Sequence, residues 1–361
     1  MSMPTAAPSQ AGRGLFGTMP DGTPVDAVTL VNKGGAAARL IGLGASLQAL
    51  WMPDRHGTLA DIVLGHDDLA TYLANRAFLG ATVGRYANRI AGGRFELDGH
   101  SFQTPCNDGP NCLHGGLKGL DLVPWTLTSH STSDAIFTCR SPDGDEGFPG
   151  NLGITSRYHL GDDNVLTVEI TATTDAPTVV NLTNHAYFNL GGAVTGGDIL
   201  GHELTLAAGR YTPVDANLIP TGELREVAGS PFDFRTPHTI GARIRDVGEA
   251  QLVLARGYDH NFVLDAGGGA EPAFAARVAD PVSGRTLELS TTEPGLQFYS
   301  GNFLTGTLPG KGGRLYRQSD ALCLEPQKFP DSPNQPRFPT ARLEPGQTYR
   351  HVSSYRFGVT G

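Results

Sequence analysis

The segment Val165–Thr171 alternates apolar and polar side chains at every step, which is the repeat of a β-strand with one buried face. Leu166, Val168 and Ile170 share one side of it. The apolar side of such a strand needs a second layer of protein to cover it. The same repeat recurs, between turn signals such as Asp98-Gly99 and Asp143-Gly144, in the segments Asp134–Cys139, Phe274–Val278 and Arg285–Ser290.

Helical spacing is confined to Asp67–Arg76, where Leu69, Tyr72 and Leu73 form one stripe. The 48 glycines and 25 prolines also favour short strands joined by turns. No change in composition and no internal repeat divides the chain. We therefore predict an all-β fold, a large antiparallel β-sandwich with very little helix. It would form a single domain over residues 15–361, after a disordered tail over residues 1–14.

The net charge of −9 is spread along the chain without a basic run, so nucleic acid is not an expected partner. No stretch of about 18 apolar residues predicts a membrane span, and the amino-terminal residues lack the apolar core of a signal peptide. The four cysteines follow no C-x-x-C spacing, which favours reduced thiols. We expect a monomer or weak homodimer in the cytoplasm, or in the periplasm only if a leader has been removed.

Three separated stretches are dense in groups that can bond hydroxyls. They are Asn88-Arg89, Asn184–Asn189, and Leu324–Gln327 with Asn334–Pro336 shortly after. Histidines and a carboxylate among amides predict proton transfer on a neutral substrate with many hydroxyls, such as a monosaccharide. The glycine-rich Gly306–Gly312 fails the spacing of a phosphate loop, and no other cofactor signature is present.

His185 lies in a run, Val179–Leu190, that is expected to be one strand. A strand there would put Asn181, Thr183, His185, Tyr187 and Asn189 on one face. A solvated sheet face is the alternative, although such faces usually carry Lys and Glu and this one has neither. His114 lies before Gly115 and Gly116, in a turn where an isolated histidine often has no role.

Glu325 follows the apolar run Ala321–Leu324, so its carboxylate must find a partner or face a cleft at the end of a buried strand. Asp259 precedes an apolar strand and could instead bond backbone amides in a turn. His114, His185, Asp259 and Glu325 are also residue types that suit zinc or iron. Because they form no short H-x-H or H-E-x-x-H pair, we expect no metal.

Seven stretches together carry a resemblance to the galactose mutarotase (aldose 1-epimerase) family. They come in the order of that family and span almost everything from Leu15 to Phe357. The stretches are Gly84–Ile90 with Gly93–Phe95, Asn107–Gly116, Glu146–Leu152, Asn181–Leu190, Tyr258–Phe262, Gln297–Asn302 and Leu324–Pro336.

The resemblance implies a large antiparallel β-sandwich that opens and recloses the ring of a free aldose. It implies that Glu325 takes the proton of the C1 hydroxyl and that His185 protonates the ring oxygen. It also implies that the substrate is held by Asn88, Arg89, His114, Asp259 and Gln297. Neither a cofactor nor a metal is implied.

Three alternatives stay open on the sequence. A hexose-6-phosphate epimerase would add a cationic pocket, for which Arg85 and Arg94 lie near Arg89. A non-catalytic sugar-binding protein would be expected to lose Glu325 or His185. A glycosidase would use a pair of carboxylates, and Asp259 with Glu325 is the only plausible pair.

Overall fold

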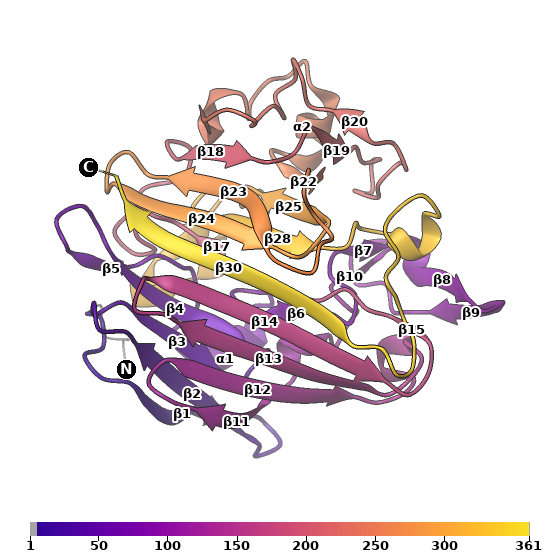
Figure 1. The fold of residues 1–361 in the computed structure, drawn as a ribbon, viewed down its shortest axis with the longest axis horizontal. Coiled ribbons are helices and arrows are strands. Elements are labelled where there is room, and N and C mark those ends of the chain that lie inside the picture. The colour runs from indigo at the N-terminus through magenta and orange to yellow at the C-terminus, as the bar shows by residue number, and fades with distance from the viewer. Residues whose placement is uncertain (1–5, 361) are drawn as a thin grey trace.

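A computed structural model describes residues 6–360, and its largest element is a nine-stranded antiparallel sheet (Figure 1). The predicted strand at Val165 is β14, whose Leu166, Val168 and Ile170 are all buried as expected. In order across the sheet the strands are β11 (Thr126–His130), β12 (Asp134–Ser141), β13 (Leu152–Leu160), β14 (Val165–Thr174), β30 (Tyr349–Val359), β24 (Arg285–Thr291), β23 (Ala273–Ala279), β18 (Glu203–Leu206) and β21 (His238–Thr239).

Two further sheets make the opposite layer. The first has six strands, in the order β17 (Tyr187–Phe188), β28 (Leu322–Gln327), β25 (Gly295–Tyr299), β22 (Asp259–Val263), β19 (Arg210–Thr212) and β20 (Arg225–Glu226). The second has five, in chain order: β1 (Gly12–Thr18), β2 (Pro24–Val31), β3 (Ala37–Ile41), β4 (Ser46–Pro53) and β5 (Leu59–Asp61). The predicted all-β sandwich is confirmed.

Five short strand pairs and two short helices complete the described chain. The pairs are β6 (Thr82–Val83) with β16 (Thr183–Asn184), β7 (Arg89–Ile90) with β10 (Cys112–Leu113), β8 (Arg94–Leu97) with β9 (His100–Gln103), β15 (Thr178–Val179) with β29 (Arg342–Leu343), and β26 (Thr305–Pro309) with β27 (Leu315–Arg317). The helices are α1 (Leu69–Ala74), inside the predicted helical segment, and α2 (Ala250–Ala255), which the sequence did not predict. Neither is long and apolar enough to cross a membrane.

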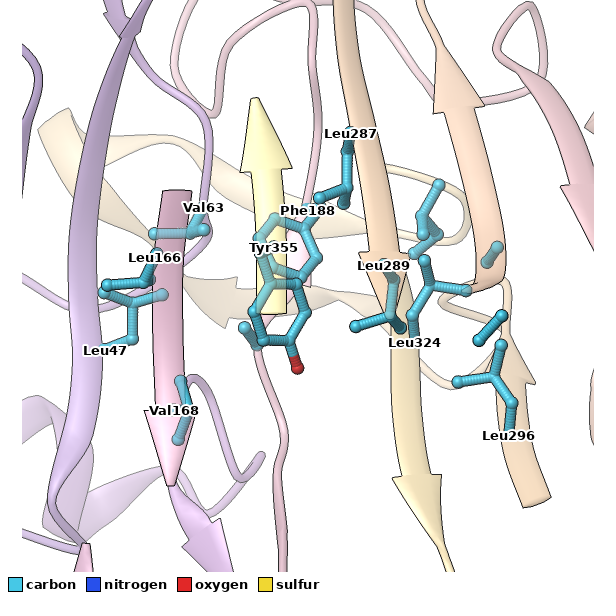
Figure 2. Packing of buried hydrophobic residues seen from close by; sticks show 14 of the residues in the cluster. Leu47, Val63, Leu166, Val168, Phe188, Leu287, Leu289, Leu296, Leu324 and Tyr355 are labelled. Atoms are coloured by element: carbon cyan, nitrogen blue, oxygen red, sulfur yellow. The ribbon is translucent and has the colours of Figure 1, made fainter. Parts of the chain in front are cut away.

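The hydrophobic core lies between the two layers. In Figure 2, Leu166 of β14 and Tyr355 of β30 lie among side chains of the opposite layer, including Leu47 of β4 and Leu324 of β28. Full burial of one such side chain contributes about 1.5–3 kcal/mol. The largest cluster of buried residues contains side chains from Val28 to Phe357.

Two expectations about the course of the chain are wrong. Regular structure begins at Gly12, not near Leu15, because β1 pairs through its backbone with β2 and needs no apolar side chains to do so. Residues 1–5 of the expected tail lie outside the described part. The run Val179–Leu190 is not one strand: its pieces β15, β16 and β17 pair with three different partners, so its polar side chains do not share a face.

Candidate functional site

A cavity of about 720 Å³ opens on the outer face of the six-stranded sheet, within the usual size of a small-molecule site. Six of the seven predicted site residues line it: Asn88, Arg89, His114, His185, Asp259 and Glu325. The seventh, Gln297, is buried beside it and reaches it through Asp259. Segments more than 200 residues apart in the chain therefore meet at one place.

The alternation of the sheet explains which residues face the cavity. In β28 the apolar Leu322 and Leu324 join the core, whereas Glu325 lies on the opposite face with the cavity. Register then puts Gln297 of β25 opposite Glu325, and Tyr299 opposite Asp259 of β22. The expectation that the strand ends at Glu325 is wrong, because β28 continues to Gln327.

The imidazole of His185 and the carboxyl of Glu325 lie next to each other at the wall of the cavity. His185 Nε2 lies 3.5 Å from Glu325 Oε2, and both side chains are at most 5% exposed. Glu325 Oε2 accepts no hydrogen bond from the described residues although it is buried. A buried carboxylate oxygen without a partner is costly, so its position facing the cavity favours a ligand that donates a proton or a hydrogen bond.

His114 is held in one tautomer by the backbone. The backbone N–H of Asn88 donates to His114 Nδ1 at 3.1 Å, so in the neutral ring the proton lies on Nε2. The His114 N–H donates in turn to the Asn88 carbonyl at 3.0 Å. Burial, and secondarily His185 and Arg89, hold the pKa of His114 well below its usual range. His114 is therefore a neutral hydrogen-bond donor into the cavity.

Arg89 and Asp259 are both fixed by neighbours. The Arg89 guanidinium is almost fully buried and donates from Nε to Asp108 Oδ2 at 2.7 Å, which leaves its other nitrogens for a ligand. Gln297 donates to Asp259 Oδ1 at 2.7 Å. Burial raises the pKa of Asp259, an effect that Arg89 and Gln297 oppose.

Burial reverses the usual order of proton affinities of a carboxyl and an imidazole for this pair. It holds the pKa of His185 down at about 4. It raises the pKa of Glu325 well above its usual range, an effect that Asp259 adds to and Arg89 opposes. Desolvation disfavours the charged form of each group. In the free protein the single proton of this pair is therefore favoured on the carboxyl, and the imidazole is neutral.

Several residues of the cavity were not predicted from the sequence as site residues. Phe78 lies against both histidines, with ring centres 4.6 Å from His114 and 5.8 Å from His185. Tyr187 stacks on His185 at 5.0 Å, and Tyr299 lines the same face. The alternation Gln297-Phe298-Tyr299 could have indicated Tyr299. Phe78 lies in a loop and gave no pattern.

His114, His185 and Glu325 are also the residues that could hold a metal, since one ligand atom of each lies within 4.8 Å of the others. Two imidazoles and a carboxylate suit zinc.

Comparisons with known proteins agree on one family. A family model described as aldose 1-epimerase matches residues 26–356. The galactose mutarotase of Mus musculus is 44% identical over 96% of this chain and 98% of its own length, and the aldose 1-epimerase of Escherichia coli is 41% identical over 94% and 96%. Among solved structures, an aldose epimerase homologue from C. elegans has a TM-score of 0.85 at 33% identity, covering 93% of this chain and 99% of its own. Galactose 1-epimerase from Lactobacillus acidophilus has a TM-score of 0.84 at 29% identity, with 98% and 100% covered.

Proposed function

Because this chain belongs to the aldose 1-epimerase family and interconverts the α and β anomers of an aldose, we propose that Glu325 and His185 carry out its proton transfers. The observation that carries this proposal is the 3.5 Å approach of the two side chains at the wall of the cavity. A carboxylate and an imidazole at this distance can act on two oxygens bonded to the same carbon, which are the C1 hydroxyl and the ring oxygen of an aldose.

The proposed cycle moves one proton at each oxygen. Glu325 takes the proton of the C1 hydroxyl as His185 gives a proton to the ring oxygen, and the bond between C1 and that oxygen breaks to an open-chain aldehyde. The aldehyde turns about its C1–C2 bond, and the reverse transfers close the ring on the other face. Ring opening leaves a protonated carboxyl beside a neutral imidazole. Burial favours that same arrangement, so the ionised pair that starts the cycle is the less populated form of the singly protonated pair.

The other cavity residues are proposed to hold the sugar. Arg89 and Asn88 donate to hydroxyls, as does His114 through Nε2, and Asp259 accepts. Gln297 acts through its hydrogen bond to Asp259. Phe78 and Tyr187 flank His185 and limit the access of water to its ring.

The charges of the cavity argue against the hexose-6-phosphate alternative. Arg76 and Arg89 are the only Arg or Lys residues among its described lining, and both are paired with carboxylates, Asp121 and Asp108. Arg85 is bonded to Ser141 and backbone carbonyls away from the cavity. The charge of each guanidinium in the cavity is therefore already balanced by a carboxylate, which disfavours a phosphate group there.

The alternative of sugar binding without turnover is disfavoured because His185 and Glu325 are both present and adjacent.

We also propose a cytoplasmic monomer or weak homodimer. All four cysteines, which lie in the described part of the chain, are unpaired, as a reducing compartment would allow.

Purified protein is expected to accelerate the change in optical rotation of freshly dissolved α-glucose or α-galactose, measured by polarimetry in plain buffer. Dialysis against a chelator should leave the rate unchanged, because the proposed transfers need only the carboxyl and the imidazole. A rate lost on chelation and restored by zinc would give the role of His114, His185 and Glu325 to a metal instead. Equal rates with and without protein, across hexoses and pentoses, would refute the activity.

Arg89→Ala is expected to raise KM at least as strongly as it lowers kcat, because the fixed guanidinium positions hydroxyls and moves no proton. It also removes the cation that opposes the raised pKa of Glu325, so the alkaline limb of the kcat/KM profile should move to higher pH. Arg94→Ala is the matched control, since Arg94 is exposed and bonded to Ser101 outside the cavity. A normal KM in Arg89→Ala would contradict the holding role.

A further inference from the structure

Asn181 is fully buried and does not line the cavity, contrary to the face on which the sequence placed it. It lies where three segments of the chain meet. One is its own segment, which leads to His185 four residues later. The second ends at Ala87, next to Asn88 and Arg89. The third follows Glu325 and contains Lys328.

The Asn181 side chain makes its hydrogen bonds to the second and third of these segments. Its Nδ2 donates to the Ala87 carbonyl at 3.0 Å and to the Lys328 carbonyl at 3.2 Å. Its Oδ1 accepts from the Lys328 N–H at 2.8 Å. Only a side-chain amide can donate twice and accept at the same time in this way.

The backbone of Asn181 adds two more bonds to the same junction. Its N–H donates to the Arg85 carbonyl at 2.9 Å, and its carbonyl accepts from the Ala87 N–H at 2.7 Å. The chain before Arg89 is thus fixed to the chain before His185. The side chain bonds both of them to Lys328, just after the strand of Glu325. It adds to the bonds of Tyr86 to the Phe329 carbonyl and of the Asp331 N–H to the Arg89 carbonyl, and to the pairing of β17 with β28.

We propose that Asn181 is a positioning residue, which sets the separation of Glu325 from His185 and Arg89. The proposal rests on the proton-transfer roles assigned above to Glu325 and His185. Proton transfer depends strongly on small displacements, and a shift of about 1 Å can cost about 10²-fold in rate. Asn181 touches none of the reacting atoms and acts only through the segments that it joins.

Asn181→Ala should lower kcat by up to about 10²-fold. Asn32→Ala is a closely matched control. Asn32 is also buried and makes the same set of bonds, with Nδ2 donating to the Gly161 carbonyl and Asn164 Oδ1 while Oδ1 accepts from the Ala36 N–H. It joins segments outside the cavity. Both variants should lose thermal stability, but only Asn181→Ala should lose kcat, and a wild-type kcat in that variant would overturn the proposal.

Asn181→Asp gives a second measurement that does not require the alanine variant to fold. The new carboxyl keeps the acceptor for Lys328 N–H and, when protonated, one donor. Burial raises the pKa of a carboxyl, so the variant should keep more activity at low pH and lose it as the group ionises. This added alkaline loss is absent from Asn181→Ala. A profile with the wild-type shape and rate would contradict the proposal.

The double variant Asn181→Ala/Glu325→Gln separates this inference from the proposed mechanism. If Asn181 acts by placing Glu325, then its removal should cost little further kcat once the carboxylate is gone. Full additivity of the two losses would show that Asn181 has a general structural effect. A fully active Glu325→Gln would instead refute the mechanism, and the comparison of Asn181→Ala with Asn32→Ala would still report on the junction.

Discussion

Glu325→Gln is expected to lower kcat by about 10²- to 10⁴-fold, the usual contribution of a positioned proton-transfer group. Glutamine keeps the shape of the side chain and its capacity for hydrogen bonds, so sugar binding should largely persist. The loss should therefore appear in kcat rather than in KM, and polarimetry at several sugar concentrations measures both. A nearly fully active variant would mean that another group is the base.

Stability provides an independent check on the role of Glu325. A buried carboxylate oxygen without a hydrogen-bond partner destabilises the folded state, so the neutral amide should leave Tm unchanged or higher. Activity and stability would then change in opposite directions. Glu169→Gln is the control, because Glu169 lies on the outer side of β14, pairs with Arg350 and does not line the cavity.

His185→Asn should also remove most of the activity, and it should change the pH profile. The pair works with one proton in total. As pH falls, the pair in the free protein gains a second proton on His185, whose pKa is about 4. As pH rises, the pair loses its one proton from Glu325, whose pKa is raised. The kcat/KM profile should be a bell whose acid limb belongs mainly to His185 and whose alkaline limb belongs mainly to Glu325.

Ordinary pKa values of a carboxyl and an imidazole would give the opposite assignment, with the alkaline limb on His185. On the present geometry the residual rate of His185→Asn should lose the alkaline limb and should rise only as Glu325, the remaining base, ionises at its raised pKa. Glu325→Gln should lose the acid limb, and its residual rate should fall as pH rises past the pKa of His185, about 4. A residual rate of His185→Asn that rises near the ordinary pKa of a carboxyl would show that the protons follow the ordinary pKa values, and His114 would be the next candidate if neither limb changes.

The strands that could be predicted from the sequence are those with one apolar and one polar face. The alternation around Leu166 and Val168 marks β14, and the same repeat marks β12, β23 and β24. The run Val179–Leu190 alternates just as clearly, yet it is broken into three short pieces. Its Asn181 and Asn189 are buried and bonded to backbone carbonyls, whereas its His185 and Tyr187 line the cavity. Sequence shows that a group is polar, but not whether it meets a ligand or a distant carbonyl.

For the site too, the sequence shows which residues are polar but not what surrounds them. Six of the predicted residues line the cavity, and they could be named because a histidine, an arginine or a carboxylate among apolar neighbours is conspicuous in any sequence. Their roles stay predictions. The order of the pKa values of His185 and Glu325 could not be foreseen, since it depends on burial by segments far away in the chain. Asn181 could not be separated from sugar-facing asparagines for the same reason.

Because β30 lies between β14 and β24, the nine-stranded sheet can be completed only after β30 has been synthesised. Every strand with which β30 pairs is synthesised before it, so until it emerges from the ribosome β14 and β24 each present an open edge that invites mispairing. Such long-range pairing is also slow to form. β30 further supplies Tyr349 and His351, which bond the Leu182 carbonyl in the segment of His185. A nascent chain without β30 therefore lacks both a closed sheet and the bonds that hold the segment of His185.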